Sequence, residues 1–445
     1  MPGVIEGLVS AGLDVARLNT SHAGISELGA QLAAVRDAAH RAGRHVAVML
    51  DLCGPKVRLG EVAEGTTLEA GAAFDLIADG GIGDARRATV SYPALHADVS
   101  PGDRILLDDG RIELVVTRVA DGVVSTRVEA GGPLSSRKGV NVPGVRLGLE
   151  GLTSADLQNL AWAQDAGIDL IAQSFVRSAA DVAALRAAMG ARVLPIVVKI
   201  EKHEALGQVD AIVAEADAVM VARGDLGVET APETVPVAQR RVVAACRAAG
   251  KPVIVATQML ESMTAARRPT RAEASDVANA IFDEVDAVML SGETAIGRHP
   301  VHVLSTMDRI VRAAEEAVST RVPVSAAAPS LGVAGAVSRA VCELAADLDV
   351  VAIVTVTQSG ATARAVAADR PRVPVLAATP DEAIARQLAL VWGIRPAVIG
   401  SYESIDTMIE AAARAARDAG IATSGQPVAV TGAVAVNVSG STAII

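Results

Sequence analysis

Short apolar runs alternate with alanine-rich helical patterns along most of the chain, and polar residues follow nearly every apolar run. An apolar strand, a polar or glycine-bearing turn and a helix, repeated in this order, are typical of a parallel sheet with crossover helices. The number of repeats favours a closed (β/α)₈ barrel of the TIM type over an open sheet. The predicted strands cover residues 14–18, 45–50, 169–175, 194–200, 217–221, 252–257 and 286–290.

The polar residues that follow these strands predict a single active site. In a parallel barrel, the loops after the carboxyl ends of the strands meet at one face, and that face carries the chemistry. Every predicted strand contributes to it. The residues concerned are Arg17 to Ser21, Asp51, Gln173 and Ser174, Lys199 and Glu201, Arg223 to Asp225, Thr257 and Gln258, and Ser291 to Glu293.

The repeat provides seven strands rather than eight, because the chain opens on the helical pattern of residues 4–11. The missing strand is the first one. A barrel that lacks a strand leaves two sheet edges exposed, which natural proteins avoid. We therefore expect an in-frame segment upstream of Met1 that encodes a short apolar strand and a Gly-Pro turn. A stop codon immediately upstream would instead favour impaired activity.

A change of pattern after the second strand predicts an inserted domain. Short runs rich in Val, Thr and Ile are separated there by turn signals such as Pro101-Gly102 and Asp121-Gly122. This pattern is typical of a small antiparallel β domain inserted after the second strand. The predicted domain limits are 1–55 and 139–320 for the barrel, 56–138 for the inserted domain and 321–445 for a C-terminal α/β domain.

The C-terminal unit follows a Pro/Ala-rich linker at residues 321–330. Its turn at residues 357–362 joins a strand to a helix, where backbone N–H groups and hydroxyl groups suit a phosphate. Ser359, Gly360 and Thr362 are the candidate residues of such a regulatory site. An ordinary N-cap turn fits the same pattern, and both interpretations stay open. The predicted strands of this unit cover residues 350–356, 373–377, 397–399 and 428–431.

Composition excludes several classes of function. The net charge of -11 argues against a nucleic-acid partner, since affinity for phosphate backbones needs excess basic charge. Aromatic residues make up 2% of the chain, which leaves no stacking platform for bases. No apolar run reaches the roughly 18 residues that span a bilayer, and no signal peptide is recognisable. The three scattered cysteines suit reduced thiols. We expect a cytoplasmic protein with no membrane partner.

Lysine is rare, with five lysines among 40 basic residues, and Lys199 is the best placed of them. It ends an apolar strand, and Glu201 emerges two residues later on the same face. Asp225 follows the next predicted strand. If the two strands are parallel neighbours, one ammonium and two carboxylates converge, and such carboxylates suit Mg²⁺. The alternative is a surface salt bridge, which fits less well because both groups end apolar strands.

Five segments carry a resemblance to a known family. They are ARLNTSH at 16–22, RKGVNVPG at 137–144, KIEKHEAL at 199–206, ARGDLGVE at 222–229 and the long stretch at 256–295 that begins ATQMLESMTAARRPTR. With these segments nearly the whole chain resembles pyruvate kinase. The resemblance implies phosphoryl transfer from phosphoenolpyruvate to ADP, giving pyruvate and ATP in the last step of glycolysis. It also implies Mg²⁺, usually a monovalent cation, a mobile lid, a regulatory C-terminal domain and commonly a homotetramer.

The resemblance also assigns roles to single residues. Arg17 would grip the transferred phosphoryl group, Lys199 would stabilise its charge in flight, and Thr257 would belong to the relay that protonates the enolate. A loose phosphoryl-transfer transition state needs cations around its equatorial oxygens, and ketonisation then needs a proton donor. The other assignments are Gly224, Asp225 and Thr257 for the substrate, Glu201 and Asp225 for Mg²⁺, Asn19, Arg58 and Lys138 for the nucleotide, and Asn19, Ser21 and Asp51 for the monovalent cation.

The chain departs from the family pattern at several positions. Leu52 and Cys53 replace the usual Thr and Lys, and Ala155 stands where many members carry Lys. These changes and the missing strand favour one alternative, a low-activity pyruvate-kinase-like metabolite sensor. A Mg²⁺-dependent barrel lyase or aldolase is a second alternative, although it would not need the lid. The intact catalytic set favours an active enzyme, and a coupled assay for pyruvate separates the three.

Lys56 stands where many members carry Glu, and this exchange bears on the monovalent cation. The family includes potassium-independent members with lysine here. A tethered ammonium carries the charge of K⁺ and forgoes the entropy cost of capturing a free ion. We therefore expect activity without added K⁺. The alternative is that Lys56 points into solvent from the lid hinge.

Overall fold

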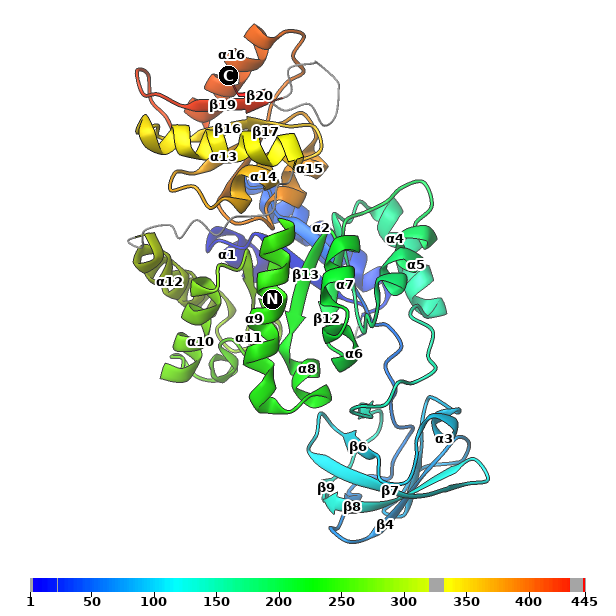
Figure 1. Cartoon of the computed structure of the whole chain (residues 1–445). Helices are drawn as coiled ribbons and strands as arrows, with labels where there is room; N and C mark the ends of the chain where they lie inside the picture. Colours follow the sequence, from blue (N-terminus) through cyan, green and yellow to red (C-terminus); the bar gives the residue numbers. More distant parts are fainter. Residues whose placement is uncertain (1–2, 22, 320–331, 433–442, 445) are drawn as a thin grey trace.

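The computed structural model describes residues 3–21, 23–319, 332–432 and 443–444. The linker predicted at 321–330 lies outside these residues. The described chain forms a barrel-type unit in the middle, a β lid at one end and an α/β domain at the other (Figure 1). We propose that the barrel covers residues 1–55 and 139–320, the lid 56–138 and the C-terminal domain 321–445.

The central unit is built on one parallel sheet of seven strands, and it confirms the predicted fold class. The strands follow each other in chain order across the sheet, and β1 and β15 are its two edges in the described part of the chain. All neighbouring pairs are parallel. The strands are β1 (Val15–Asn19), β2 (Ala47–Leu52), β11 (Leu170–Gln173), β12 (Ile196–Ile200), β13 (Ala218–Ala222), β14 (Val253–Ala256) and β15 (Ala287–Met289).

Strand limits differ by a few residues from the sequence prediction for identifiable reasons. β12 begins at Ile196 because Pro195 has no N–H group to give to the sheet. β14 ends at Ala256 because the backbone of Thr257 turns to a positive φ of 68°. The same happens after β11, where Phe175 has a φ of 56°. Positive φ is incompatible with a strand, so the chain turns away at these points.

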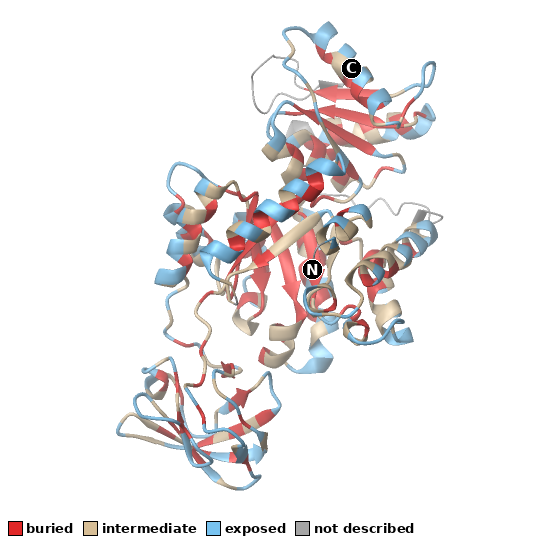
Figure 2. Cartoon of the chain, turned by 180° about the vertical axis from the view of Figure 1, so that it is seen from behind, coloured by how far each residue is buried: buried red, intermediate tan, exposed pale blue. Residues whose placement is uncertain are grey.

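Helices pack on the outer side of this sheet and bury its apolar residues. Val48, Leu50 and Val198 face the helices in the largest core, whereas Met49 and Val197 fill the inner side of the curled sheet. This alternation follows the period of two along each strand, and Figure 2 shows the strands as the buried centre. The helices are α1 (Val4–Ser10), α2 (Ile25–Arg41), α4 (Ser154–Ala166), α5 (Ala179–Ala188), α6 (His203–Leu206), α7 (Val209–Glu215), α8 (Arg223–Glu229), α9 (Val235–Ala249), α10 (Arg271–Phe282), α11 (Gly292–Ala295) and α12 (Pro300–Ser319), with 3₁₀ turns η1 (Pro232–Thr234) and η2 (Glu261–Thr264).

The lid leaves the barrel after β2 and encloses a core of its own. Its main sheet has the order β10-β6-β7-β8-β4-β5, and β3 pairs with β9 beside it. Asp121 and Gly122 both have positive φ, and as a two-residue Asp-Gly turn they join β7 to β8 in the way that suits the strand twist. The elements are β3 (Thr67–Leu68), β4 (Ala73–Ile77), β5 (Arg87–Thr89), α3 (Leu95–Asp98), β6 (Arg104–Leu107), β7 (Ile112–Ala120), β8 (Val123–Ala130), β9 (Gly132–Pro133) and β10 (Val140–Asn141).

The C-terminal domain is a second α/β unit with the strand order β18-β17-β16-β19-β20. Its third strand starts earlier than the sequence indicated and contains Pro396, which is tolerated because β18 is an edge strand. No helix among the described residues is long and apolar enough to cross a membrane. The elements are α13 (Gly332–Asp347), β16 (Ile353–Val356), α14 (Ala361–Ala368), β17 (Val375–Thr379), α15 (Glu382–Leu388), β18 (Ile394–Val398), α16 (Ile405–Asp418), β19 (Ala429–Gly432) and β20 (Ala443–Ile444).

One buried carboxylate ties the barrel to the C-terminal domain. Asp169, 1% exposed, accepts from Arg36 Nη2 (2.6 Å) and from the backbone N–H of Val48 (2.7 Å). Its other oxygen accepts from Arg386 Nε of α15 (2.8 Å). The C-terminal domain therefore sits at the end of the sheet where the strands begin, opposite the lid (Figure 1).

Candidate active site

Lys199 lies at the centre of the polar face formed by the carboxyl ends of the strands. It stands on β12 with its ammonium 2.8 Å from Glu201 Oε1 and 3.3 Å from Asp51 Oδ1. It also donates to Ser174 Oγ (2.8 Å). Burial works against the charge, but the carboxylates of Asp51 and Glu201 outweigh it and raise the pKa of Lys199 above its ordinary value. The side chain is therefore a fixed, permanently charged ammonium.

Asp51, at the end of β2, holds a second cation in this face. Arg17 on the neighbouring strand β1 donates from Nε to Asp51 Oδ2 (2.6 Å). Burial alone would raise the pKa of Asp51, but Lys199 and Arg17 hold it below the usual range. The guanidinium of Arg17 remains partly open to solvent, so it keeps donors free for an anionic ligand.

Two carboxylates stand where a divalent cation would bind. β12 and β13 are parallel neighbours, so Glu201 after β12 and Asp225 after β13 emerge at the same edge. Burial raises the pKa of Glu201; the ammonium of Lys199 lowers it, while the charge of Asp225 raises it further. Mutual repulsion of this kind is relieved by a shared cation, and carboxylate oxygens are the ligands that Mg²⁺ prefers.

The donor set fits Mg²⁺ better than a metal held entirely by protein. Among the described residues there is no group of three or more His, Cys, Asp or Glu side chains placed to hold an ion. Mg²⁺ is usually held by one or two carboxylates together with waters and substrate phosphates. Glu201 and Asp225 match that pattern.

Thr257 faces the same edge from the end of β14, in a strained conformation. Its φ of 68° is unusual for a β-branched residue, and Gln258 follows with a φ of 54°. Thr257 Oγ1 accepts from the N–H of Gly224 (2.7 Å), and its carbonyl accepts from Arg223 Nη2 (2.6 Å). The buried Arg223 thereby fixes the position of the hydroxyl beside the turn that carries Asp225.

Lys56 reaches into this face from the hinge that leads to the lid. Its Nζ lies 3.3 Å from Asp225 Oδ1 and 5.9 Å from the centre of the Phe175 ring. It does not point into solvent from the hinge. Two residues of the predicted cation corner are joined by a local bond, in which Asn19 Oδ1 accepts from the N–H of Ser21 (3.0 Å).

A cleft between the lid and the barrel opens beside Asp225. It has a volume of about 550 Å³, and Lys56 and Asp109 line it from the lid side, with Gly224 and Gln258 on the barrel side. A cavity of this size suits a nucleotide-sized ligand.

The other two nucleotide candidates of the lid have local partners. Lys138 pairs with Asp108 (2.8 Å) and Arg58 donates to the carbonyl of Arg137 (3.3 Å). Neither lines the cleft beside Asp225.

Leu52 does not face the site. It is buried in the core between the sheet and the helices, on the opposite side of β2 from Asp51. Its replacement of the family's usual residue therefore changes the core rather than the polar face.

A buried contact between the lid and the barrel was missed by sequence reasoning. Glu229, at the end of α8 and 3% exposed, accepts from Lys202 Nζ (2.6 Å). It also accepts from Asn141 Nδ2 of the lid strand β10 (2.7 Å). Asp225 lies in the first turn of the same helix, so Glu229 connects the lid with the helix that carries this carboxylate. The scarcity of lysine was the one signal that could have singled out Lys202.

The predicted phosphate turn of the C-terminal domain is compatible with both interpretations, a phosphate site and an ordinary N-cap turn. Thr357 Oγ1 accepts from the N–H of Gly360 (3.0 Å), and Gly360 has a φ of 76° just before α14 begins. This local bond is what an ordinary turn would make. Ser359, Gly360 and Thr362 stay candidates for a phosphate site.

Comparisons with known proteins agree with the arrangement. The sequence profile of the pyruvate kinase barrel domain matches residues 2–304, and that of the pyruvate kinase alpha/beta domain matches residues 335–445. The chain is 44% identical over 443 residues to a pyruvate kinase of Geobacillus stearothermophilus, covering 98% of this chain and 76% of the relative. It is 39% identical over 446 residues to that of Clostridium acetobutylicum, covering 99% and 94%. It is 44% identical over 411 residues to that of Corynebacterium efficiens, covering 92% and 86%.

Proposed function

Because the chain belongs to the pyruvate kinase family, we infer that it transfers a phosphoryl group from phosphoenolpyruvate to ADP, giving pyruvate and ATP. This is the last step of glycolysis. The observation that carries the inference for this chain is the buried ammonium of Lys199 between Asp51 and Glu201, at the same strand ends as Asp225. Nothing in the comparisons supports the metabolite sensor or the lyase as alternatives.

We propose that Lys199 and Arg17 neutralise the phosphoryl group while it moves. The bond from phosphorus to the enol oxygen of phosphoenolpyruvate breaks as the bond to a terminal oxygen of ADP forms. Charge on the three equatorial oxygens is then best met by fixed cations. Asp51 supports this role because its bonds to both side chains hold them in place before substrate arrives.

We propose that Glu201 and Asp225 hold Mg²⁺, which would supply charge neutralisation and align the phosphoryl and enolate oxygens. The repulsion that raises the pKa of Glu201 supports this assignment. The backbone of Gly224 and Asp225 would face the substrate carboxylate.

We propose that Thr257 stands on the path of the proton that ends the reaction. Once the phosphoryl group has left, the enolate of pyruvate must take a proton at its methylene carbon. The hydroxyl of Thr257 is held beside Gly224 by a bond of 2.7 Å and by a strained backbone. Strain of this kind is retained where surrounding structure fixes a functional group.

We propose that the nucleotide enters the cleft beside Asp225. Family resemblance alone makes Asn19, Arg58 and Lys138 the residues proposed for its phosphates, since none of the three lines this cleft. The position of Lys56 next to Asp225 supports activity without added K⁺, because a tethered ammonium supplies the charge of the ion. Asn19, Ser21 and Asp51 remain the proposed corner for a monovalent cation.

A cytoplasmic homotetramer without nucleic-acid or membrane partners is proposed on family membership, and light scattering on the purified protein tests the assembly.

A coupled assay on the purified protein tests the function. Pyruvate should form only when phosphoenolpyruvate, ADP and Mg²⁺ are all present. Pyruvate formation without ADP would point to a phosphatase or lyase reaction, and its absence in the full mixture would favour the sensor.

A further inference from the structure

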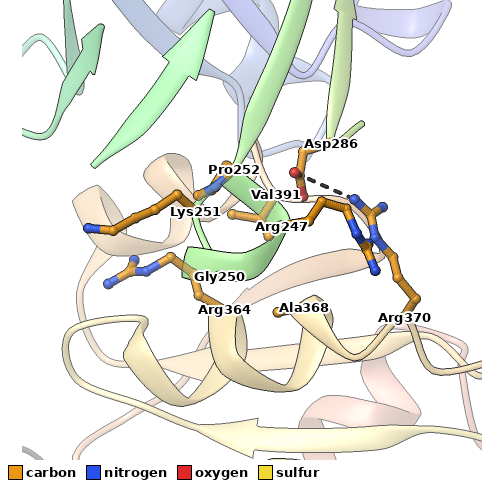
Figure 3. Close-up of a pocket in the computed structure, with 9 residues that line it drawn as sticks. All are labelled: Arg247, Gly250, Lys251, Pro252, Asp286, Arg364, Ala368, Arg370 and Val391. Carbon is orange, nitrogen blue, oxygen red and sulfur yellow. Dashed lines mark ion pairs between the residues drawn. The ribbon is translucent and has the colours of Figure 1, made fainter. Parts of the chain in front are cut away.

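A small cavity between the barrel and the C-terminal domain is lined by four basic side chains. Arg247 and Lys251 come from the end of α9 and the residues that follow it. Arg364 comes from α14, and Arg370 from the residues after that helix. In Figure 3 Lys251 and Arg364 end at one side of the cavity, and Arg247 and Arg370 at the other. Asp286 is the one carboxylate that lines it.

The carboxylates around the cavity are already engaged by other groups. Asp286 accepts from the backbone N–H groups of Val253 (3.0 Å) and Trp392 (3.2 Å) and lies 3.5 Å from Arg370. Glu284 pairs with Arg247 (2.7 Å). Neither of these two carboxylates forms an ion pair with Lys251 or Arg364.

Lys251 and Arg364 have no ion-pair partner within the described ranges. Lys251 donates to the carbonyl of Ala216 (2.7 Å), and Arg364 donates to the carbonyl of Ser359 (3.0 Å). Asp217 is the carboxylate whose charge reaches Arg364, but it is bonded to Arg186 (3.0 Å). Lys251 and Arg364 thus approach each other from two domains, stabilised by carbonyl groups and, for Arg364, by the charge of an already paired Asp217.

Arg370 adds an unsatisfied donor to the same cavity. Its Nη2 donates to the carbonyl of Glu284 (2.5 Å), and its guanidinium stacks 4.5 Å from the ring of Trp392. Its Nε, however, is buried without an acceptor. Burial lowers the pKa values of Arg364 and Arg370, because a charged guanidinium is less stable away from water.

The size of the cavity limits what can neutralise it. Its volume is about 20 Å³, compared on the same measure with about 10–15 Å³ for one water molecule. The space admits one or two oxygen atoms of an anion, and a sugar ring or a base does not fit. Guanidinium groups bind tetrahedral oxyanions in two-pronged fashion, and an ammonium completes such a site as a point charge.

We propose that this cavity is a binding site for a phosphate-type oxyanion that links Lys251 of the barrel to Arg364 of the C-terminal domain. Arg370 Nε is a further donor from the same side of the boundary as Arg364. The bound anion replaces repulsion between the two domains by attraction on both sides. The site is separate from the turn at residues 357–362, whose candidate residues do not line the cavity. The shared chemistry admits inorganic phosphate or the phosphoryl group of a metabolite, and inorganic phosphate is favoured because it carries no sugar ring that must stay outside the cavity.

Thermal unfolding with added phosphate tests the site at constant ionic strength, with chloride as the balancing anion. The wild-type midpoint should rise with phosphate concentration, and Lys251→Met and Arg364→Met should each weaken the apparent Kd of that rise at least about tenfold. Arg372→Met removes an exposed arginine of the same segment that does not line the cavity, and it should behave as wild type. A hexose monophosphate at equal concentration should raise the midpoint less than inorganic phosphate; a larger rise would assign the site to a metabolite phosphoryl group.

Two further readouts separate this site from other phosphate sites and from a purely structural role. Without phosphate, Lys251→Met and Arg364→Met should be at least as stable as wild type, because each relieves repulsion. Crystals of the wild-type protein soaked in selenate should show an anomalous peak within hydrogen-bonding distance of Lys251 and Arg364. The proposal is overturned if no peak lies there while selenate occupies another site, or if both variants are destabilised and keep the full phosphate response.

Discussion

Lys56 Nζ, on the hinge to the lid, lies 3.3 Å from Oδ1 of Asp225, at the start of a barrel helix. The two residues are 169 positions apart in the chain. The contact brings a tethered positive charge to the edge of the sheet where a carboxylate stands ready for a cation. It also means that the hinge of the lid is in direct contact with one of the two carboxylates proposed to bind Mg²⁺.

We predict from this contact that activity does not require added K⁺. Lys56→Glu should create a potassium requirement, because it exchanges the resident positive charge for a negative one that a monovalent cation must balance. Initial rates in potassium chloride and in tetramethylammonium chloride at equal ionic strength measure the effect. Strong K⁺ activation of the unmodified enzyme would exclude the proposed role of Lys56.

Glu201 and Asp225 should share the divalent ion. Glu201→Gln and Asp225→Asn each remove one charge, and each should raise the Mg²⁺ concentration for half-maximal rate by at least about tenfold. Mutations of residues that only support the metal ligands already lower metal affinity by this factor. Binding of Mn²⁺, followed by its paramagnetic resonance signal, gives a second readout that is independent of turnover. Glu215→Gln, at an exposed position of α7, is the matched control and should leave both quantities unchanged. Unaltered Mg²⁺ titrations in both site variants would refute the assignment.

The bond from Asn141 to Glu229 should hold the lid against the barrel. Asn141→Ala removes a hydrogen bond to a charged acceptor, typically worth about 1.5–3 kcal/mol, and Asn141→Asp adds repulsion between two carboxylates. Amide hydrogen exchange at Val140 and Val142 should therefore speed up in the order wild type, Ala, Asp, and the KM for ADP should rise in parallel.

Gln158→Ala serves as the control for this lid contact, since it truncates an exposed amide of α4. Equal exchange rates in wild type and Asn141→Asp would show that the lid is held by other contacts.

Glu273 should contribute pH-dependent stability at the start of α10. Burial works against its charge, but hydrogen bonds from Ser262 and Thr270 outweigh burial and hold the pKa of Glu273 below its ordinary value. A carboxyl with a depressed folded-state pKa stabilises the protein fully above its unfolded value of about 4.3. That contribution is lost as the pH falls through the folded value.

Urea midpoints of wild type and Glu273→Gln measure this contribution. The difference between them should be largest at pH 7 and should shrink at about pH 3.5. A gap that stays constant over this range would mean that the carboxylate charge does not matter.

The parts of the fold that sequence could predict are those with a local signal. Val197, Lys199 and Glu201 alternate along a single strand, so their shared face follows from the period of two. The Asp121-Gly122 turn carries its own backbone preference, and the structure places a hairpin there.

Other features have no local signal. A β-branched residue avoids positive φ, so nothing in the sequence marks the strained backbone of Thr257. The contacts of Lys56 with Asp225 and of Asn141 with Glu229 join distant segments, and they depend on how the lid docks. Pro396 even argued against the strand that contains it, because proline is excluded from central strands. Whether a strand lies at the edge depends on the whole sheet and cannot be seen in the local sequence.

The kinetics of Lys199→Met test the central claim most directly. Lys199→Met removes the ammonium that is held 2.8 Å from Glu201, and Arg372→Met, at an exposed position of the C-terminal domain, is the control. Loss of a charge that acts mainly in the transition state should lower kcat by about 10²-fold or more while the KM for phosphoenolpyruvate changes little. Thermal unfolding of each variant checks that it is folded. The account predicts rapid pyruvate formation by wild type and by Arg372→Met, and near-complete loss of turnover in folded Lys199→Met; near-normal kcat in Lys199→Met would contradict it.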